Sequence, residues 1–388
     1  MCHIQTHPGD TVNRAAHLIP ADIPGLEAAR PGYPNAMAKL HLPGRHHEDD
    51  VAAAPHVPAP EEAGPGRQVE QAAPDTPAKL PRRAWAAVFK GSLREFRDDE
   101  LTDRAAALTY YGVLALFPAL LVLVSLLAVA GRSATDKVLA DLRHLAPGSA
   151  RDIITRAVEQ LQNNAGTGSV MAVVGLVLAV WSASGYVAAF IRAANAVYDM
   201  PEGRPVWKIL PVRVGVTLVL MVLAVASALI VVFTGGLARR AGQALGAGDM
   251  ALTVWSIAKW PVLVVLVTMM IAILYWATPN ARVKGFRWIT PGSVLALAIW
   301  MIASAGFAFY VGNFASYNKT YGTMAGVIVF LVWLWISNLA ILLGLEFDAE
   351  TVRQRAVAGG HPPEAEPYTQ PRDTSKWDEE DVRRLNET

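Results

Sequence analysis

The chain has 388 residues, of which 53% are hydrophobic and only 17% are charged, and its formal net charge is +1. Soluble domains carry about 25% charged residues, so this composition argues against an ordinary soluble protein. The near-zero net charge argues against a protein held to nucleic acid by a general basic field. A single cysteine, Cys2, excludes an internal disulfide and a multi-cysteine metal site.

Residues 1–80 contain 12 of the 25 prolines and seven of the nine histidines, with few large apolar residues and no helical period. Such a segment buries too little apolar surface to offset its chain entropy, so we predict a disordered cytoplasmic tail. The run HHEDD at 46–50 could bind a metal loosely, but a solvated polar run is the preferred interpretation. No signal peptide is predicted at the N-terminal start of this segment.

Residues 82–104 alternate basic and apolar side chains, and the apolar ones share one helical face. They are Trp85, Val88, Phe89, Leu93 and Phe96. This pattern predicts a basic amphipathic helix at the membrane interface, and a calmodulin-like or nucleic-acid-binding helix is the alternative.

Six apolar runs follow, and each is about as long as a helix needs to be to cross a hydrocarbon core roughly 30 Å thick. They are 106–130, 168–191, 212–236, 254–277, 291–312 and 323–345, within a transmembrane domain at 105–350. We therefore predict an all-α, polytopic membrane helix bundle with about six transmembrane helices.

Two further segments complete the predicted organisation. The connection 131–167 has two apolar stripes separated by Pro147-Gly148, which predicts an external helical hairpin. Residues 351–388 are polar and are predicted to form a cytoplasmic tail.

The orientation follows from lysine and arginine in the flanks of the spans. With the N-terminus inside, the inner segments hold 15 basic residues and the outer segments hold nine. This asymmetry predicts that both termini are cytoplasmic.

Several short motifs lie in order at the ends of the predicted spans. They are AAALTYY at 105–111, LFP at 116–118, WSASG at 181–185, AN at 194–195, TPN at 278–280, YG at 321–322, WLW at 333–335 and LGLE at 343–346. In this order the set resembles the YihY/BrkB family of bacterial inner-membrane proteins over about 85–352. The resemblance implies a six-helix protein of the inner (cytoplasmic) membrane, in a family that has carried the labels virulence factor BrkB and ribonuclease BN.

A metal-dependent ribonuclease needs clustered histidines or acids to hold its ions. Outside 1–80 only His144 and His361 remain, and no acidic pair falls inside a predicted span. We therefore predict that the protein is not an enzyme, with no catalytic residue, no metal site and no cofactor.

The predicted topology brings polar residues of several helix ends to the cytoplasmic edge. The candidate cluster consists of Asp103, Arg104, Arg192, Asn195, Asp199, Asn280 and Glu346. We expect Arg104 or Arg192 to pair with Glu346, which would form a gate, or a headgroup or anion site. The alternative is a set of ordinary capping and snorkelling residues.

A few polar side chains lie within the spans and are candidates for lining a substrate path. They are Tyr110, Tyr111, Ser182, Ser184 and Asn338. The alternative is that they form hydrogen bonds between helices and hold the bundle together.

No acidic residue lies near the middle of a predicted span, which disfavours a proton- or sodium-coupled pump of the usual kind. The leading hypothesis is transport or export of a lipid-like or small amphipathic solute, with membrane lipids as partners and no nucleic acid. A non-transporting scaffold that acts through its cytoplasmic tails is the alternative, and a ribonuclease is third.

Overall fold

The computed structural model describes residues 57–129, 168–232, 249–283, 290–313 and 323–387. All of them belong to one of the two compact units of the chain, residues 53–388. Within these ranges the regular elements are helices and no β-strand occurs. The prediction of an all-α fold is therefore confirmed.

The long helices coincide with the six predicted spans. They are α3 (Leu101–Val129), α6 (Gly168–Val197), α7 (Val206–Val232), α9 (Asp249–Ala277), α10 (Pro291–Asn313) and α12 (Thr323–Ala358). By length and composition, five of them are able to cross a membrane, namely α6, α7, α9, α10 and α12. Helix α3 covers the first predicted span, but the side chains of 117–129 lie outside the described residues. The protein is a multi-pass membrane helix bundle.

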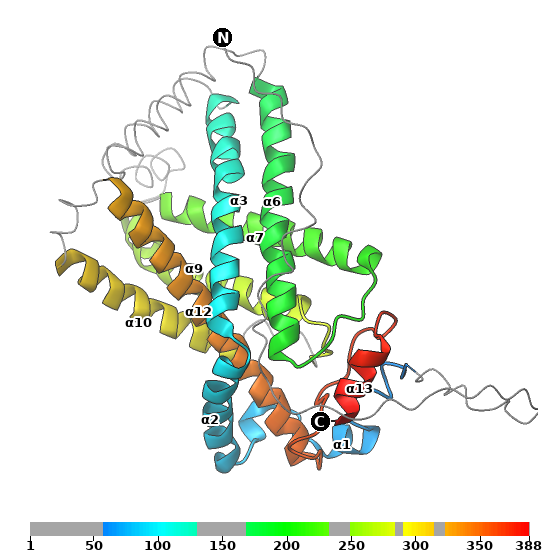
Figure 1. Ribbon diagram of the computed structural model, residues 1–388. Helices are drawn as coiled ribbons and strands as arrows, with labels where there is room; N and C mark the ends of the chain where they lie inside the picture. Colours follow the sequence, from blue (N-terminus) through cyan, green and yellow to red (C-terminus); the bar gives the residue numbers. More distant parts are fainter. Residues whose placement is uncertain (1–56, 130–167, 233–248, 284–289, 314–322, 388) are drawn as a thin grey trace, which may run out of the picture. The chain divides into compact units, whose positions relative to one another are not determined.

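Helix α6 is the most enclosed of the five spans. It runs beside α3 (Figure 1) and also contacts α7 and α12. Of its most apolar stretch 39% is buried, against 11% for α7 and for α10. Val187, Phe190 and Ala194 of α6 form a core with Leu342 and Leu345 of α12.

Helices α10 and α12 cross closely at two glycines. A Cβ atom on Gly292 would lie 2.1 Å from the backbone oxygen of Gly344, and one on Gly344 would lie 2.5 Å from the oxygen of Gly292. Only glycine allows this approach, which is the usual way that membrane helices pack tightly. The Tyr275 hydroxyl of α9 donates a hydrogen bond to the Ile341 carbonyl beside the crossing.

Residues 57–80 differ from the predicted disordered tail. They contain α1 (Arg67–Ala72) and the short 3₁₀ helix η1 (Pro77–Lys79), and Ala73 is buried. The Arg355 side chain of α12 donates to the Pro74 carbonyl at 2.7 Å. The prediction was wrong here because tertiary contacts with α12 order a segment that has no strong local pattern. The rest of the predicted tail, 1–56, lies outside the described residues.

The predicted interfacial helix 82–104 is shorter than expected. Helix α2 (Arg82–Asp98) ends before a two-residue break, and Glu100 has a φ of +51°, in the left-handed region. Val88 is fully buried, whereas Phe89 and Leu93 are exposed. Helix α2 therefore packs one edge against α12 and leaves part of its apolar face uncovered.

Helix α12 continues to Ala358, well beyond the predicted end of the sixth span at 345. The chain then folds back onto the bundle, burying Tyr368 and Trp377, before α13 (Glu379–Glu387). The predicted tail 351–388 thus begins inside a helix and packs against the core. The predicted hairpin 131–167 lies outside the described residues.

Candidate functional site

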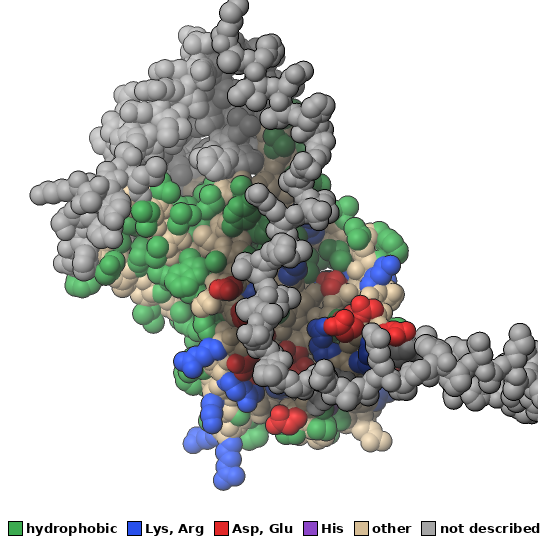
Figure 2. Space-filling model, viewed as in Figure 1, with side chains coloured by type: hydrophobic (Ala, Val, Ile, Leu, Met, Phe, Trp, Pro, Cys, Tyr) green, Lys and Arg blue, Asp and Glu red, His purple; other side chains and the backbone are tan. Residues whose placement is uncertain are grey.

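Polar and charged residues gather where several spans end. We call this region the polar end: the ends of α6 and α9, the start of α10, residues 346–358 of α12, and the C-terminal strap, residues 366–377. Figure 2 shows acidic and basic side chains grouped together on this face, apart from the hydrophobic surface of the helices. The polar end contains most of the cluster predicted from the sequence.

Asn195 and Asn280 join the ends of α6 and α9. The Asn195 side chain accepts a hydrogen bond from the Asn280 backbone N–H at 2.7 Å and donates to Glu202 at 2.9 Å. Glu202 in turn forms an ion pair with the buried Arg204, at 2.7 Å, and Arg204 donates to the Thr278 carbonyl. Two residues that are 85 positions apart in the chain are therefore directly hydrogen-bonded.

Asn280 also holds the C-terminal strap. Its side-chain amide donates to the carbonyls of Pro201 and Asp373, at 2.9 and 2.8 Å, and its side-chain oxygen accepts from the Asp373 N–H. Gly203 lies against the strap so closely that a Cβ atom would be 1.9 Å from the Asp373 carbonyl oxygen. The Asp373 carboxylate pairs with Lys208 of α7 at 2.5 Å.

Arg353 of α12 lies among three carboxylates. Its guanidinium is 2.8 Å from Asp199, 3.5 Å from Glu350 and 3.4 Å from Glu366, and it stacks over the Tyr368 ring at 4.5 Å. Burial raises the pKa of Asp199 to about 8; Glu366 and Asp99 also raise it, and Arg353 lowers it. The predicted cluster included Asp199 but missed Arg353, because nothing local in the sequence of α12 indicates that it meets the residue just after α6.

Glu346 is 1% exposed, and its Oε2 atom has no hydrogen-bond partner within the described residues. It lies beside Asp99, whose carboxyl forms a hydrogen bond with it. We expected Arg104 or Arg192 as the partner of Glu346. Instead, Arg104 donates to the Asp99 carbonyl at 2.7 Å.

Asp103 and Arg192 lie at the margin of the polar end. Both are exposed, and the Arg192 guanidinium lies over the ring of Tyr111 at 5.8 Å. Tyr111 is half-buried and Tyr110 is 60% exposed. The structure therefore brings Asn195, Asp199, Asn280 and Glu346 together but leaves Asp103 and Arg192 outside that group.

The remaining candidate path residues form hydrogen bonds between helices. Asn338 of α12 donates to Thr109 of α3 at 3.1 Å and accepts from the Tyr186 hydroxyl of α6 at 2.9 Å. Ser182 donates to the Leu114 carbonyl of α3 at 2.9 Å, and Ser184 accepts from Arg213 of α7. These contacts match the alternative in which polar side chains hold the spans together.

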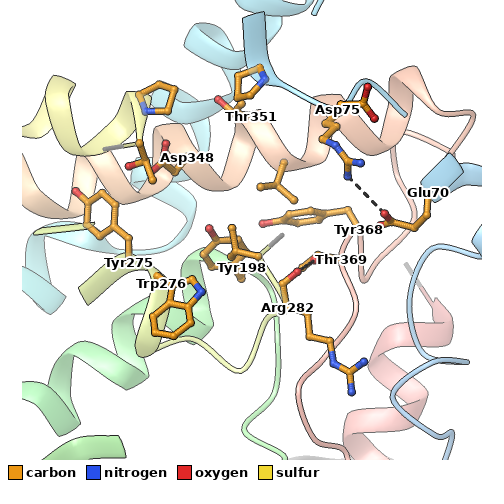
Figure 3. A pocket seen from close by; sticks show the side chains of 16 residues that line it. Glu70, Asp75, Tyr198, Tyr275, Trp276, Arg282, Asp348, Thr351, Tyr368 and Thr369 are labelled. Atoms are coloured by element: carbon orange, nitrogen blue, oxygen red, sulfur yellow. Dashed lines mark hydrogen bonds and ion pairs between the residues drawn. The ribbon is translucent and has the colours of Figure 1, made fainter. Parts of the chain in front are cut away.

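A cavity of about 140 Å³ opens at the polar end. Aromatic side chains from three elements form much of its wall, namely Tyr198, Tyr275, Trp276 and Tyr368, and Asp348 and Thr351 of α12 lie opposite them (Figure 3). The Asp348 carboxylate accepts from the Gly292 N–H at 2.7 Å, at the positive end of the α10 dipole. Sequence reasoning missed this cavity because its lining comes from six separate segments.

Within the described residues, no group of three or more His, Cys, Asp or Glu side chains is placed to hold a metal ion. The acids of the polar end are instead spread around Arg353 and Asp99. The geometry suits electrostatic contacts and proton binding more than metal coordination.

Comparison with known proteins shows which family the chain belongs to. The model of the family described as "Virulence factor BrkB" matches residues 92–369. The chain belongs to this family. The match begins in α2 and ends within the C-terminal strap, so it includes the polar end except residues 370–377. This agrees with the resemblance drawn from the motifs at the helix ends.

Curated relatives agree with this assignment. A ribonuclease-like protein, YfkH, of Bacillus subtilis is 32% identical over 260 residues, which is 67% of this chain and 93% of YfkH. UPF0761 membrane proteins of Xanthomonas campestris pv. campestris and Alkalilimnicola ehrlichii are 30% and 32% identical, over 69% and 68% of this chain. The matches span 61% and 59% of those two relatives. No solved structure matches the chain.

Proposed function

We propose that this BrkB-family protein transports a lipid-like or small amphipathic solute across the bacterial inner membrane, with both termini in the cytoplasm. The observation that carries the proposal is the aromatic-walled cavity where the spans end. A wall of tyrosine and tryptophan with a few polar groups suits a molecule that has both an apolar and a polar part.

The size of the cavity limits which solutes can bind in it. Pockets for drug-sized ligands measure roughly 300–1,000 Å³, and this one measures about 140 Å³. It has room for a headgroup or another small polar group, and a lipid tail would have to lie elsewhere. The exposed apolar surfaces of α7 and α10 offer a place for such a tail in the bilayer.

The test is transport by the full chain in vesicles of phosphatidylethanolamine and phosphatidylglycerol that contain tail-labelled fluorescent copies of each lipid. An impermeant quencher then reports how fast the label crosses the bilayer. The variant Val352→Trp fills the cavity wall, and Val222→Trp, on an exposed face of α7, is the matched control.

We expect wild type and Val222→Trp to move label well above empty vesicles, and Val352→Trp to lose most of this activity while its thermal unfolding stays cooperative. Wild type that moves neither lipid would contradict lipid transport. A folded Val352→Trp with full activity would remove the cavity from the mechanism.

The scaffold alternative depends on which tail is free to recruit a partner. The C-terminal strap is bound to the bundle through Asn280 and Lys208, so a recruiting role falls to the residues before 57. A deletion of 1–56 spares the packed segment 57–80. It should leave transport intact, whereas a scaffold would lose its function.

The third candidate comes from the name of YfkH, which is ribonuclease-like. We propose that the present chain is not a nuclease. Incubating purified protein with RNA, with and without divalent metal, tests this directly, and metal-dependent cleavage that co-purifies with the protein would overturn it.

A further inference from the structure

The carboxyl groups of Asp99 and Glu346 meet at the junction of α2 and α3. Asp99 is the residue between the two helices, and Glu346 lies on α12, which packs against both of them (Figure 1). A hydrogen bond links the two carboxyl groups. A hydrogen bond between carboxyl groups requires a proton on one of them, because two carboxylates only accept.

The surroundings of this pair are mostly acidic. The acidic groups that act electrostatically on Glu346 are Asp99 of the junction, Asp199 just after α6, Glu95 of α2, and Glu350 of its own helix. Two cations, Arg104 of α3 and Arg353 of α12, act on Asp99, and Glu366 of the C-terminal strap acts on Asp199. Arg353 is already shared among three carboxylates, at 2.8 to 3.5 Å.

Glu346 itself is a buried acid that forms no ion pair with a cation among the described residues. It is 1% exposed, and its Oε2 atom has no hydrogen-bond partner within the described residues. A buried carboxylate in this state is costly unless it is paired or protonated. A metal ion is not supported as the partner, because no group of three His, Cys, Asp or Glu side chains in the described part of the chain is placed to hold one.

We propose that Asp99 and Glu346 bind one proton between them, and that this proton holds the α2–α3 junction against α12. When the proton leaves, two adjacent carboxylates repel each other across the junction. The junction is suited to move because it is two residues long and contains Glu100 in a left-handed conformation. The group that would move with it is α2, with its basic residues and its exposed Phe89 and Leu93.

Burial raises the pKa of Asp99 to about 6; Glu95 also raises it, while Arg104, the hydrogen bond with Glu346, and Arg353 lower it. The pair therefore loses its first proton in mildly acidic conditions, and the remaining proton, which the two groups share, leaves only in a second step at higher pH. This proposal goes beyond transport and does not depend on it, because a scaffold would bind the same proton.

The experiment uses the full chain in lipid nanodiscs, with two measurements between about pH 5 and about pH 11, so that both deprotonation steps of the pair fall within the range. Infrared difference spectroscopy detects the carbonyl stretch of a protonated carboxylic acid. Hydrogen exchange of residues 95–102 reports whether the junction opens. The variants are Glu346→Gln and Asp99→Asn, and the matched control is Asp103→Asn, an exposed acid one turn into α3.

In wild type we expect the infrared band to lose intensity in two steps as the pH rises. The protection factors of the junction amides, which are corrected for the intrinsic pH dependence of exchange, should fall severalfold at the second step. In each variant only one of the two steps should remain, and the junction amides should stay protected across the range, whereas Asp103→Asn should behave as wild type. If Glu346→Gln does not fold, Asp99→Asn at the half-buried junction carries the same test. Junction protection factors that do not change with pH in wild type, or a two-step titration of the band that survives both substitutions, would overturn the proposal.

Discussion

The polar end and the apolar spans of this bundle are held together by different kinds of contact. At the polar end, Asn280 alone makes hydrogen bonds to α6, to the Pro201 carbonyl and to the strap. Along α7 and α10 only 11% of the apolar stretch is buried, and side chains such as Val222 are exposed. The contrast shows that position-specific contacts are concentrated where the spans end, while much of the spans meets its surroundings through non-specific apolar contact.

The largest effect is expected at the α10–α12 crossing, which links the two regions. In Gly344→Ala the new Cβ atom would lie 2.5 Å from the Gly292 oxygen and 2.6 Å from the Cβ atom of Ala296. Because backbone has to move, we expect a loss of about 3 kcal/mol of unfolding free energy. Denaturant titration in mixed micelles measures it.

Gly326→Ala is the control for this substitution, since nothing lies within 4 Å of its Cβ position on the same helix. There the change should be neutral or stabilising by up to about 1 kcal/mol, the helix propensity difference between the two residues. Equal effects at the two positions would contradict the close crossing.

Asn280→Ala should give the next largest effect. It removes the side-chain hydrogen bonds to Pro201 and Asp373 and leaves buried backbone groups unsatisfied, at a cost of about 2 kcal/mol. We also expect limited proteolysis to cut the released strap between 366 and 377. A strap that stays protected in a folded Asn280→Ala protein would show that Asn280 does not hold it.

Substitution of Asp373 should have a smaller effect on the free energy of unfolding, and this effect depends on pH. Burial raises the pKa of Asp373, but hydrogen bonds from Lys208 and Ser375 outweigh it and lower the pKa to about 2. A carboxylate with a lowered pKa stabilises the fold above its ordinary pKa of 3.8 and loses this contribution as the pH falls toward 2.

We expect the ion pair between Asp373 and Lys208 to stabilise the fold by only about 1 kcal/mol. Lys208 is more than half exposed, so solvent screens the pair. The measurement is the difference in unfolding free energy between wild type and Asp373→Asn at about pH 6 and about pH 2.5. The difference should shrink at the lower pH. A constant difference would mean that the ion pair does not stabilise the strap.

The smallest effects separate the interior of the spans from their outer faces. Val187→Ala on α6 removes a side chain that is 2% exposed and should cost about 1 kcal/mol of packing. Val222→Ala on α7 removes one that is 68% exposed and should change stability by less than about 0.5 kcal/mol. Thermal unfolding of both variants in one detergent makes the comparison, and similar losses would mean that α7 packs against a surface beyond the described residues.

The membrane fold was predictable because its evidence is local in the sequence. A run of about 20 apolar residues forms a spanning helix whatever its neighbours do, since lipid leaves the backbone no other partners. Helices α7, α9 and α10 therefore lie close to the predicted 212–236, 254–277 and 291–312. Short motifs along the spans, such as TPN directly after α9, were the features by which the family could be named.

The pairings at the polar end were only partly predictable. The predicted topology put Asn195 and Asn280 in one candidate cluster at the cytoplasmic edge, and in the structure the Asn280 N–H donates a hydrogen bond to the Asn195 side chain. The same reasoning paired Glu346 with an arginine, because opposite charges are the usual partners of a buried acid. Instead, the structure places Asp99 beside Glu346, and Asp99 was not among the candidates because it lies before the predicted start of the first span.

The sequence by itself determined that this chain spans a membrane several times, that its helices end near the predicted positions, and which family it resembles. These properties depend on apolar length and on motifs, which each segment carries alone. The tertiary structure decided that 57–80 and the C-terminal strap pack on the bundle, that aromatic residues of several segments enclose a cavity, and that two acids share one junction. Those contacts join residues far apart in the chain, and packing geometry selects them among many partners that composition allows equally.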